Sequence, residues 1–272
     1  MKRFIRLLVL VLLPAAWNPL AAQADTSFHL LRRIPGTIVD FTVDNLDNVY
    51  VLNDRNRLVK YSPDGDSLGA FNDVRKFGQV STIDASNPLR ILLYYKDFTT
   101  IVILDRFLNV RNTIDLRKQQ LFQVTAVGQS YDNKIWLYDE QESKLRKIDE
   151  DGKLLLATPD LRLLTGTAPM PVRLYDENKY VYLCDPANGI YVFDYFGSLK
   201  NVIEIRKWQN LKVAGKYIFG SLGSKLYRYD ISTFRYDEWQ LPAPLVNSLS
   251  FNFSAARIYA LKKDGLDIYR LQ

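Results

Sequence analysis

The stretch Lys60-Tyr61-Ser62-Pro63-Asp64-Gly65 ends a β-rich run with turn residues, and related stretches recur at four later points of the chain. The equivalent positions are Ser62, Asp105, Asp149, Asp194 and Asp230. They are separated by 36 to 45 residues, and one further step of 42 residues reaches Gln272, the last residue. A period of about 40 to 45 residues that contains several strands is typical of the blades of a β-propeller. The sequence therefore predicts an all-β ring of blades.

The first repeat divides into four short β-rich runs separated by turn residues. These runs are 38–43, 49–52, 57–61 and 67–71. The second run of a repeat is almost continuously apolar, and it can be found six times. Its occurrences are 49–52, 91–94, 135–138, 181–184, 217–219 and 258–261. Such runs are typical of strands covered on both faces, as in a blade packed between two neighbours, so six blades are predicted.

The last repeat indicates how the ring closes. It contains the runs 248–251, 257–261 and 266–271, but no fourth run. A spare run, 28–34, stands before the first repeat. We expect this N-terminal strand to complete the last blade, because closure removes the exposed edges of an open array of sheets. A β-sandwich, the rival all-β fold, would not explain a strand missing at one end and surplus at the other.

Two stretches of the first repeat resemble the six-bladed NHL-type propellers and their YWTD-like and lactonase-like relatives. They are Asp44-Asn45-Leu46-Asp47-Asn48-Val49-Tyr50-Val51 and Arg57-Leu58-Val59-Lys60-Tyr61-Ser62-Pro63-Asp64-Gly65. The third repeat resembles the same pattern at Lys147-Ile148-Asp149-Glu150-Asp151-Gly152. The resemblance covers nearly all of residues 25–272 and implies one six-bladed domain there. Its lactonase-like relatives hold Ca²⁺ with carboxylate and amide oxygens of the inner strands and mouth loops.

The first 24 residues have the organisation of a secretory signal peptide. The basic residues that begin it are Lys2, Arg3 and Arg6. An apolar run at 8–13 follows, and Ala22-Gln23-Ala24 has the small-x-small pattern of a cleavage site. A retained membrane anchor is the alternative, but the run is shorter than the roughly 20 residues that span a bilayer, and Pro14 interrupts it. We expect cleavage after Ala24 and a periplasmic or secreted mature protein.

Charge argues against nucleic acid as a partner. The segment 1–24 carries three of the 36 basic residues and none of the 30 acidic residues, so the mature chain has a net charge of +3. Lys and Arg are interleaved with Asp and Glu, whereas nucleic-acid binding requires a dense basic stripe. No other long apolar span follows, so no transmembrane segment is expected in the mature chain.

Residues that commonly carry catalysis are scarce. His29 is the only histidine and lies on the expected closing strand. Cys184 is the only cysteine and ends an apolar run, so we expect a buried free thiol. One His and one Cys cannot build a zinc site of His and Cys ligands. No Gly-x-Ser-x-Gly elbow or Gly-rich phosphate loop accompanies them, so no catalytic residues are assigned.

The enzyme alternative is a calcium-dependent lactonase-like or esterase-like hydrolase with its metal in the central channel. Ca²⁺ takes about six to eight oxygen ligands. Carboxylates on the inner runs are Asp40, Asp84 and Asp176, and those at the ends of second runs are Asp139 and Asp185. Asp at a strand end is also favoured for local hydrogen bonds to the backbone. A metal role and a turn role therefore both remain open for these residues.

The scarcity of His and Cys chemistry favours a binding or scaffolding module without a cofactor over an enzyme. The ligand would be a protein, a peptide or a glycan, recognised by loops between the blades, since loops on a rigid scaffold commonly carry binding. The longer connections are 161–172 and 117–120. A third possibility is an accessory subunit of a larger envelope complex.

Overall fold

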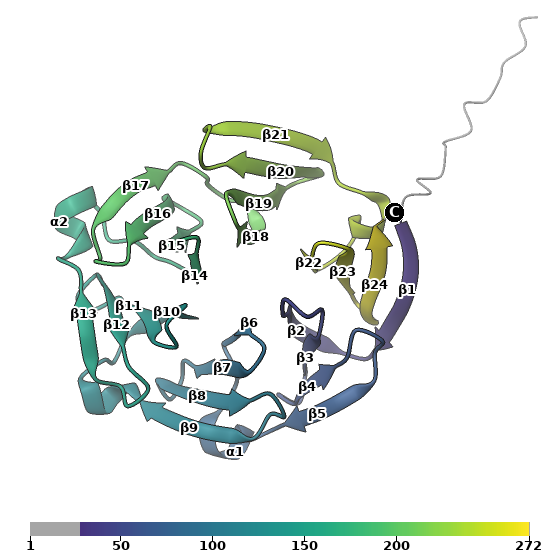
Figure 1. Cartoon of the computed structure of the whole chain (residues 1–272), viewed down its shortest axis with the longest axis horizontal. Coiled ribbons are helices and arrows are strands. Elements are labelled where there is room, and N and C mark those ends of the chain that lie inside the picture. Colours follow the sequence, from purple (N-terminus) through teal and green to yellow (C-terminus); the bar gives the residue numbers. More distant parts are fainter. Residues whose placement is uncertain (1–27, 272) are drawn as a thin grey trace, which may run out of the picture.

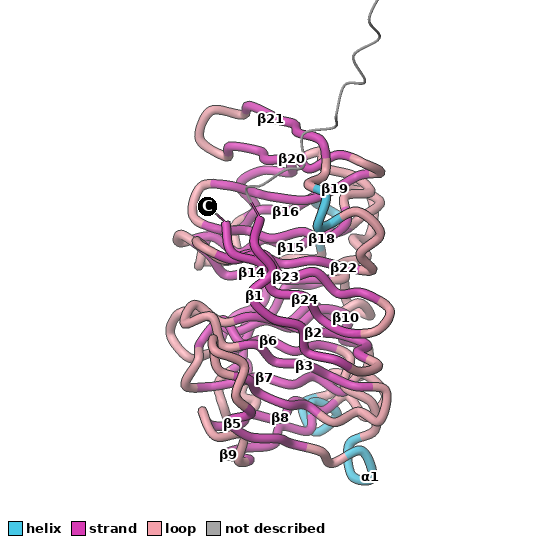
Figure 2. The backbone as a smooth tube through the Cα atoms, turned by 90° about the vertical axis from the view of Figure 1, so that its right-hand side faces the viewer, coloured by secondary structure: helices cyan, strands magenta, loops and turns pink. Residues whose placement is uncertain are grey.

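The structure, a computed structural model, describes residues 28–271. These residues form six four-stranded antiparallel sheets, which stand as blades around a central axis (Figure 1). Seen from the side, the ring is a thick disc whose loops lie on its two faces (Figure 2). The predicted six-bladed β-propeller is therefore confirmed. The predicted signal peptide lies outside the described residues.

Blades 1 to 5 each consist of four consecutive strands, the first innermost and the fourth outermost. Blade 1 contains β2 (Ile38–Val43), β3 (Val49–Asn53), β4 (Leu58–Tyr61) and β5 (Ser67–Phe71). Blade 2 contains β6 (Thr82–Asn87), β7 (Arg90–Tyr95), β8 (Thr100–Asp105) and β9 (Val110–Asp115). Blade 3 contains β10 (Val124–Gln129), β11 (Ile135–Asp139), β12 (Lys144–Ile148) and β13 (Leu154–Ala157). Blade 4 contains β14 (Arg173–Glu177), β15 (Tyr180–Asp185), β16 (Gly189–Asp194) and β17 (Leu199–Ile203). Blade 5 contains β18 (Gln209–Ala214), β19 (Tyr217–Leu222), β20 (Lys225–Asp230) and β21 (Arg235–Gln240).

Blade 6 joins the two ends of the described chain. It contains β22 (Ser250–Phe253), β23 (Arg257–Lys262), β24 (Gly265–Leu271) and, as its outer strand, β1 (Phe28–Pro35). β1 pairs with β24 in antiparallel register. Gly265 is required at the end of this pair, because a Cβ there would lie 2.4 Å from the Ile34 carbonyl oxygen. Arg33 adds an ion pair to Asp267, with 2.5 Å between Nε and Oδ1. The predicted closure by the N-terminal strand is confirmed.

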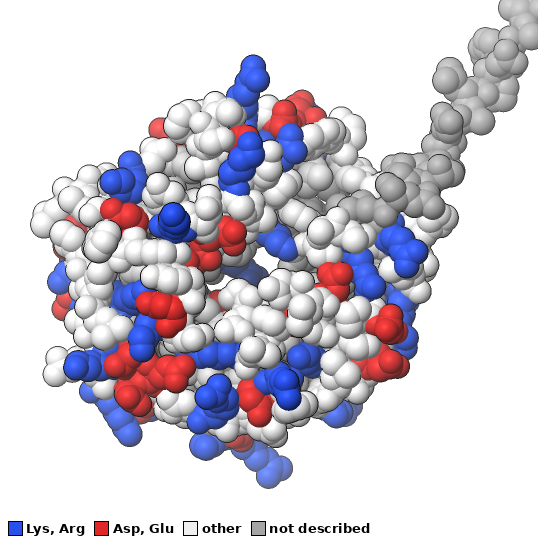
Figure 3. Space-filling model, in the orientation of Figure 1, with Lys and Arg blue, Asp and Glu red and all other residues white. Residues whose placement is uncertain are grey.

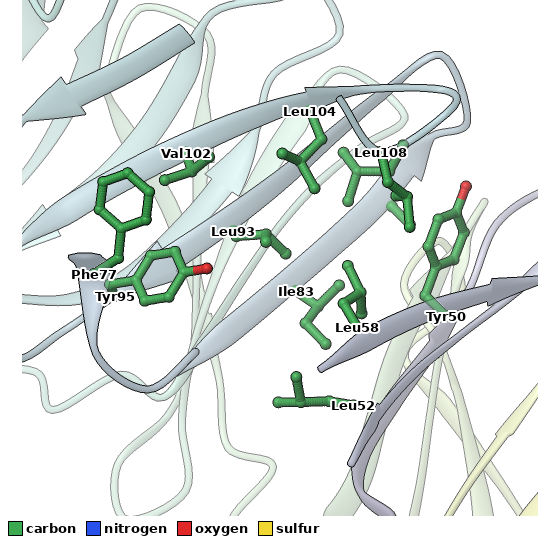
Figure 4. Packing of buried hydrophobic residues seen from close by; sticks show 12 residues of the cluster. Tyr50, Leu52, Leu58, Phe77, Ile83, Leu93, Tyr95, Val102, Leu104 and Leu108 are labelled. Carbon is green, nitrogen blue, oxygen red and sulfur yellow. The ribbon is translucent and has the colours of Figure 1, made fainter. Parts of the chain in front are cut away.

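The hydrophobic core lies in layers between neighbouring blades. Figure 4 shows the layer between blades 1 and 2, where Tyr50 and Leu58 of one blade approach Ile83 and Leu93 of the next. The second strands are almost fully buried because each is covered on both faces, as their continuous apolar character predicts. Blade 5 differs, since only three of the six residues of β19 are buried and four of the six residues of β20 are half-buried.

The aspartate that marks the repeat caps the turn between the third and fourth strands of a blade. Asp105 Oδ1 accepts hydrogen bonds from the backbone N–H groups of Phe107 (2.8 Å) and Asn109 (2.9 Å). Asp149 and Asp194 accept from the second and fourth residues that follow them in the same way. Carboxylates of this kind replace the missing backbone partners of a tight turn. The sequence signal that predicts the ring is therefore a structural one.

Short helices lie in the connections between blades. They are α1 (Val74–Phe77), η1 (Leu116–Gln119), α2 (Leu161–Thr165) and η2 (Ala243–Leu245). Each connects the outer strand of one blade to the inner strand of the next, so all four lie on the same face of the disc. None of the helices within residues 28–271 is long and apolar enough to cross a membrane.

Candidate functional site

The centre of the ring holds a cavity of about 670 Å³, lined by the inner strands of all six blades. Figure 3 shows the opening at the centre of the disc, with both acidic and basic side chains close to its rim. A smaller cavity of about 280 Å³ lies away from the channel, beside Tyr94, Lys96 and Glu140. The channel is the better candidate, because more charged and polar side chains converge on it and its size suits a small ligand.

Seven charged side chains line the channel cavity. The acidic ones are Asp40, Asp44, Asp84, Asp176 and Glu177, and the basic ones are Arg173 and Lys212. What each can do chemically depends on the hydrogen bonds that the protein itself already makes to it. Most of them prove to hold neighbouring segments together.

Asp176 joins blades 3 and 4. Its Oδ2 atom accepts hydrogen bonds from Ser130 Oγ (2.7 Å) and from the indole N–H of Trp136 (3.1 Å). Its Oδ1 atom accepts from the Tyr195 hydroxyl (2.5 Å). Burial and this bond to Asp176 together raise the pKa of Tyr195, so its hydroxyl stays a donor. Both carboxylate oxygens of Asp176 are thus occupied by the protein.

Asp84 plays the same part between blades 2 and 3. Its carboxylate accepts from the backbone N–H of Gln129 (2.7 Å) and from that of Ser86 (2.9 Å). The Gln129 side-chain amide also donates to the Asp84 carbonyl oxygen at 3.0 Å. This carboxylate is therefore largely satisfied, like that of Asp176.

Lys212 connects blades 5 and 6, and Glu177 connects blades 4 and 5. Lys212 Nζ donates to Asn252 Oδ1 (3.1 Å) and to the Phe253 carbonyl oxygen, both of blade 6. Burial lowers the pKa of Lys212. Glu177 Oε1 accepts from the backbone N–H of Gly215 (3.1 Å), which joins blades 4 and 5.

Arg173 and Asp40 are the exceptions. Within the described part of the chain, the Arg173 guanidinium makes no hydrogen bond and no ion pair, although water reaches it from the channel. Burial opposes its charge, but nearby Tyr175, Asp40 and Asp84 outweigh burial and hold its pKa above the ordinary value. Asp40 accepts one hydrogen bond, from the backbone N–H of Phe41 (2.8 Å). Burial raises the pKa of Asp40, and Arg173 opposes that shift.

The five carboxylates suggested for calcium divide into two groups. Asp40, Asp84 and Asp176 line the channel, whereas Asp139 and Asp185 end second strands and are absent from the described cavity lining. No cluster of three or more His, Cys, Asp or Glu side chains suited to a metal ion occurs within residues 28–271.

The two outer carboxylates serve local structure. Asp139 pairs with Arg146, with 2.9 Å between Oδ2 and Nη2. Asp185 accepts hydrogen bonds from the backbone N–H groups of Met170 (2.8 Å) and Ala187 (2.8 Å) and from Asn188 Nδ2 (2.8 Å). Both carboxylates thus make contacts with residues close to them in the sequence.

Sequence reasoning did not single out three channel-lining side chains of β14. Arg173, Tyr175 and Glu177 occupy alternate positions of this strand, and all three line the channel. Side chains two apart on a strand share one face, so polar residues at these three alternate positions were the available signal. An inner strand that alternates in this way has one face in water.

The single cysteine and the single histidine lie where the sequence predicted. Cys184 is fully buried opposite Arg173 in the β14–β15 pair, and burial raises the pKa of its thiol to about 12. His29 lies on β1, the outer strand of blade 6. Neither belongs to the described lining of the channel cavity.

Comparison with known proteins defines the class of fold. The sequence matches no family model, and it matches no curated protein. Similar solved structures include the WD40 domain of Neurospora crassa Pan2, with 10% identity, a TM-score of 0.67, and coverage of 90% of this chain and 95% of that one. Another is a catalytically inactive virginiamycin B lyase from Staphylococcus aureus with quinupristin, with 13% identity, a TM-score of 0.65, and coverage of 90% and 100%.

A streptogramin B lyase structure is also similar, with 15% identity, a TM-score of 0.59, and coverage of 86% of this chain and 79% of that one. At these identities the likeness concerns the fold alone. The chain is a six-bladed β-propeller.

Proposed function

We propose that this protein is a non-catalytic, exported β-propeller that binds a protein, peptide or glycan ligand at the mouth of its central channel. The observation that carries the proposal is the channel cavity itself, which all six inner strands line and in which Arg173 and Asp40 keep unused hydrogen-bonding capacity. A concave site with a few convergent polar groups on a rigid scaffold is typical of ligand binding. A role as the accessory subunit of an envelope complex would use the same surface.

The positions of the reactive residues support binding rather than catalysis. The virginiamycin B lyase crystallised with quinupristin is a variant inactivated by replacing one histidine with alanine. In this chain the single histidine, His29, lies on the outer strand of blade 6, away from the channel. The buried Cys184 thiol stays protonated near neutral pH because its pKa is raised. A thiol of this kind is a poor nucleophile.

A channel-blocking substitution tests this proposal. Ser86 lines the cavity, so Ser86→Trp fills part of it, whereas Ser67→Trp places the same side chain on the outer strand β5. The wild type and both variants are immobilised and exposed to an extract of the source organism's envelope and medium. The wild type and Ser67→Trp should retain the same ligand, and Ser86→Trp should not retain it. Equal capture by all three proteins would contradict binding in the channel.

A calcium-dependent lactonase-like or esterase-like hydrolase is the second candidate. It is supported by Asp40, Asp84 and Asp176, whose carboxylates line the same cavity. Calorimetric titration with Ca²⁺, combined with the melting temperature, distinguishes the two functions. Tight binding with a rise in melting temperature would favour the hydrolase and justify a screen of lactones and esters. A flat titration would favour the binding module.

Export and the NHL-type relationship are parts of the same proposal. The basic start, the apolar run and the Ala22-Gln23-Ala24 pattern support cleavage after Ala24 and a periplasmic or secreted protein. The stretches 44–51 and 57–65 support the NHL-type relationship. N-terminal sequencing of the protein from the periplasm or medium should give Asp25 as the first residue.

A further inference from the structure

We propose that the channel binds a small zwitterionic ligand, namely an amino acid or a short peptide with both ends free, by its carboxylate at Arg173 and its ammonium group at Asp40. This inference rests on the proposed function, since it assigns a chemical class to the ligand of the same channel. It depends on Arg173 and Asp40, two charged side chains of the channel that keep unused hydrogen-bonding capacity.

Arg173 is arranged to receive a carboxylate. A guanidinium presents five N–H donors in a planar fork, which matches the two oxygens of a carboxylate. All five lack partners among residues 28–271, although the side chain lines the cavity and water reaches it. The opposite charges near Arg173 belong to Asp40 and Asp84, yet neither forms an ion pair with it in the described structure. A bound carboxylate would supply the missing acceptors.

Asp40 is arranged to receive a donor. An ionised carboxylate offers about four lone-pair sites, and the backbone N–H of Phe41 uses one of them. Asp176, Asp84 and Asp44 differ, because they accept several hydrogen bonds each from the protein. Glu177 also accepts one hydrogen bond, but it lies on β14, the same strand as Arg173. Asp40 is therefore the carboxylate with unused capacity that lies on a different blade from Arg173.

The two side chains come from opposite sides of the ring. Asp40 belongs to β2 of blade 1 and Arg173 to β14 of blade 4, three blades further round (Figure 1). Each influences the pKa of the other across the channel. A ligand with one charge at each end can thus contact both walls at once. The cavity of about 670 Å³ suits a molecule of that size.

The balance of charge selects a zwitterion over a simple anion or cation. Five acidic and two basic side chains line the channel, so a phosphate dianion would meet repulsion around the single unpaired Arg173. A simple cation would satisfy Asp40 but leave the guanidinium without an acceptor. Like charges at close range disfavour a ligand, and complementary ones select it. A zwitterion complements both groups.

Trialanine and its two capped forms provide the test. Calorimetric titration of the wild-type protein should show binding of trialanine, and much weaker binding of its C-terminal amide and of its N-acetyl form. Arg173→Met should lower the affinity for trialanine at least about tenfold and abolish the preference for a free carboxylate. Asp40→Asn should abolish the preference for a free ammonium group.

Two further variants control for folding and for general charge. Arg173→Lys keeps the charge without the fork and should bind with intermediate affinity. Arg75→Met removes an exposed arginine of α1 and should bind like the wild type. Absence of trialanine binding at millimolar concentrations, or equal binding of the capped peptides, would overturn the inference. If Ser86→Trp still abolished ligand capture in that case, the proposed function would stand and only the ligand class would be wrong.

Discussion

At the residue scale, the aspartates of the channel differ in how many hydrogen bonds they accept from the protein. Asp176 and Asp84 face the channel and accept hydrogen bonds from neighbouring segments, whereas Asp40 accepts a bond only from the adjacent residue Phe41. The sequence placed all three on inner strands, as the structure does. It could not distinguish their roles, because the donors Trp136 and Gln129 come from other strands or blades. Arg173 was missed for the same reason.

Removal of the Asp176 carboxylate should loosen the contact between blades 3 and 4. Asp176→Ala leaves the indole N–H of Trp136 and the Tyr195 hydroxyl without their acceptor, so the free energy of unfolding should fall by about 1 to 3 kcal/mol. Asp54→Ala, at an exposed turn, is the matched control. Denaturant unfolding measures both. Equal stability of the two variants would show that Asp176 does not hold the blades together.

Cys184 should be unreactive in the folded protein. Burial raises the pKa of its thiol to about 12, so the thiolate is scarce at pH 8 and reagents cannot reach it. An aromatic disulfide reagent should therefore label no thiol in the native protein and one thiol per chain in denaturant. Ligand binding by Cys184→Ala should equal that of the wild type. Rapid labelling of the native protein would contradict the buried position.

At the element scale, the sequence predicted best those strands whose pattern is set by burial alone. The second strands β3, β7, β11, β15, β19 and β23 all occur where continuous apolar runs were found. The inner strand of blade 6 was placed two residues too early, at 248, because Ser248 belongs to the turn after η2, where its N–H donates to Leu245. The inner strand β18 was not identified, since its half-polar residues face the channel.

The turn after β15 should depend on Asp185 and on its charge. Burial acts to raise the pKa of Asp185, but hydrogen bonds from Met170, Asn188 and Ala187 outweigh burial and hold it below the ordinary value. Because the folded-state pKa is depressed, the charged form stabilises the fold above the ordinary pKa of about 3.9 and this contribution is lost as the pH falls further.

Asp185→Ala should therefore lower the free energy of unfolding by about 1 to 3 kcal/mol at pH 7. Its free energy of unfolding should also decrease less than that of the wild type when the pH is lowered from about 4 to about 2. Urea unfolding at several pH values gives both quantities. If Asp185 were instead a calcium ligand, removal of Ca²⁺ would destabilise the wild type. The difference in free energy of unfolding between the wild type and Asp185→Ala at pH 7 would then vanish.

At the scale of the whole molecule, the ring depends on one pairing between the two ends of the described chain. A strand missing from the last repeat and surplus before the first made this closure predictable from the sequence. The candidate site was less predictable, because six separate strands bring its lining side chains to one axis. At such low identity, the similarity to solved structures concerns the architecture and gives no information on the ligand.

Deletion of residues 25–36 should destabilise the whole ring. It removes β1, the Arg33–Asp267 ion pair and the cover over β24, so blade 6 would keep an open edge. The melting temperature of the truncated protein should fall sharply, and an added peptide of sequence 28–35 should restore part of it. A truncated protein with the melting temperature of the full mature chain would show that closure contributes little.

The central claim is that the ligand is bound at the central channel. The most direct measurement is site-specific photo-crosslinking with a benzophenone amino acid at Thr42, which lines the cavity, and at Ser67, on the outer strand of the same blade. With the ligand-containing extract, Thr42 should form an adduct that excess unlabelled ligand prevents, and Ser67 should form none. Adducts at Ser67 with none at Thr42 would contradict binding in the channel.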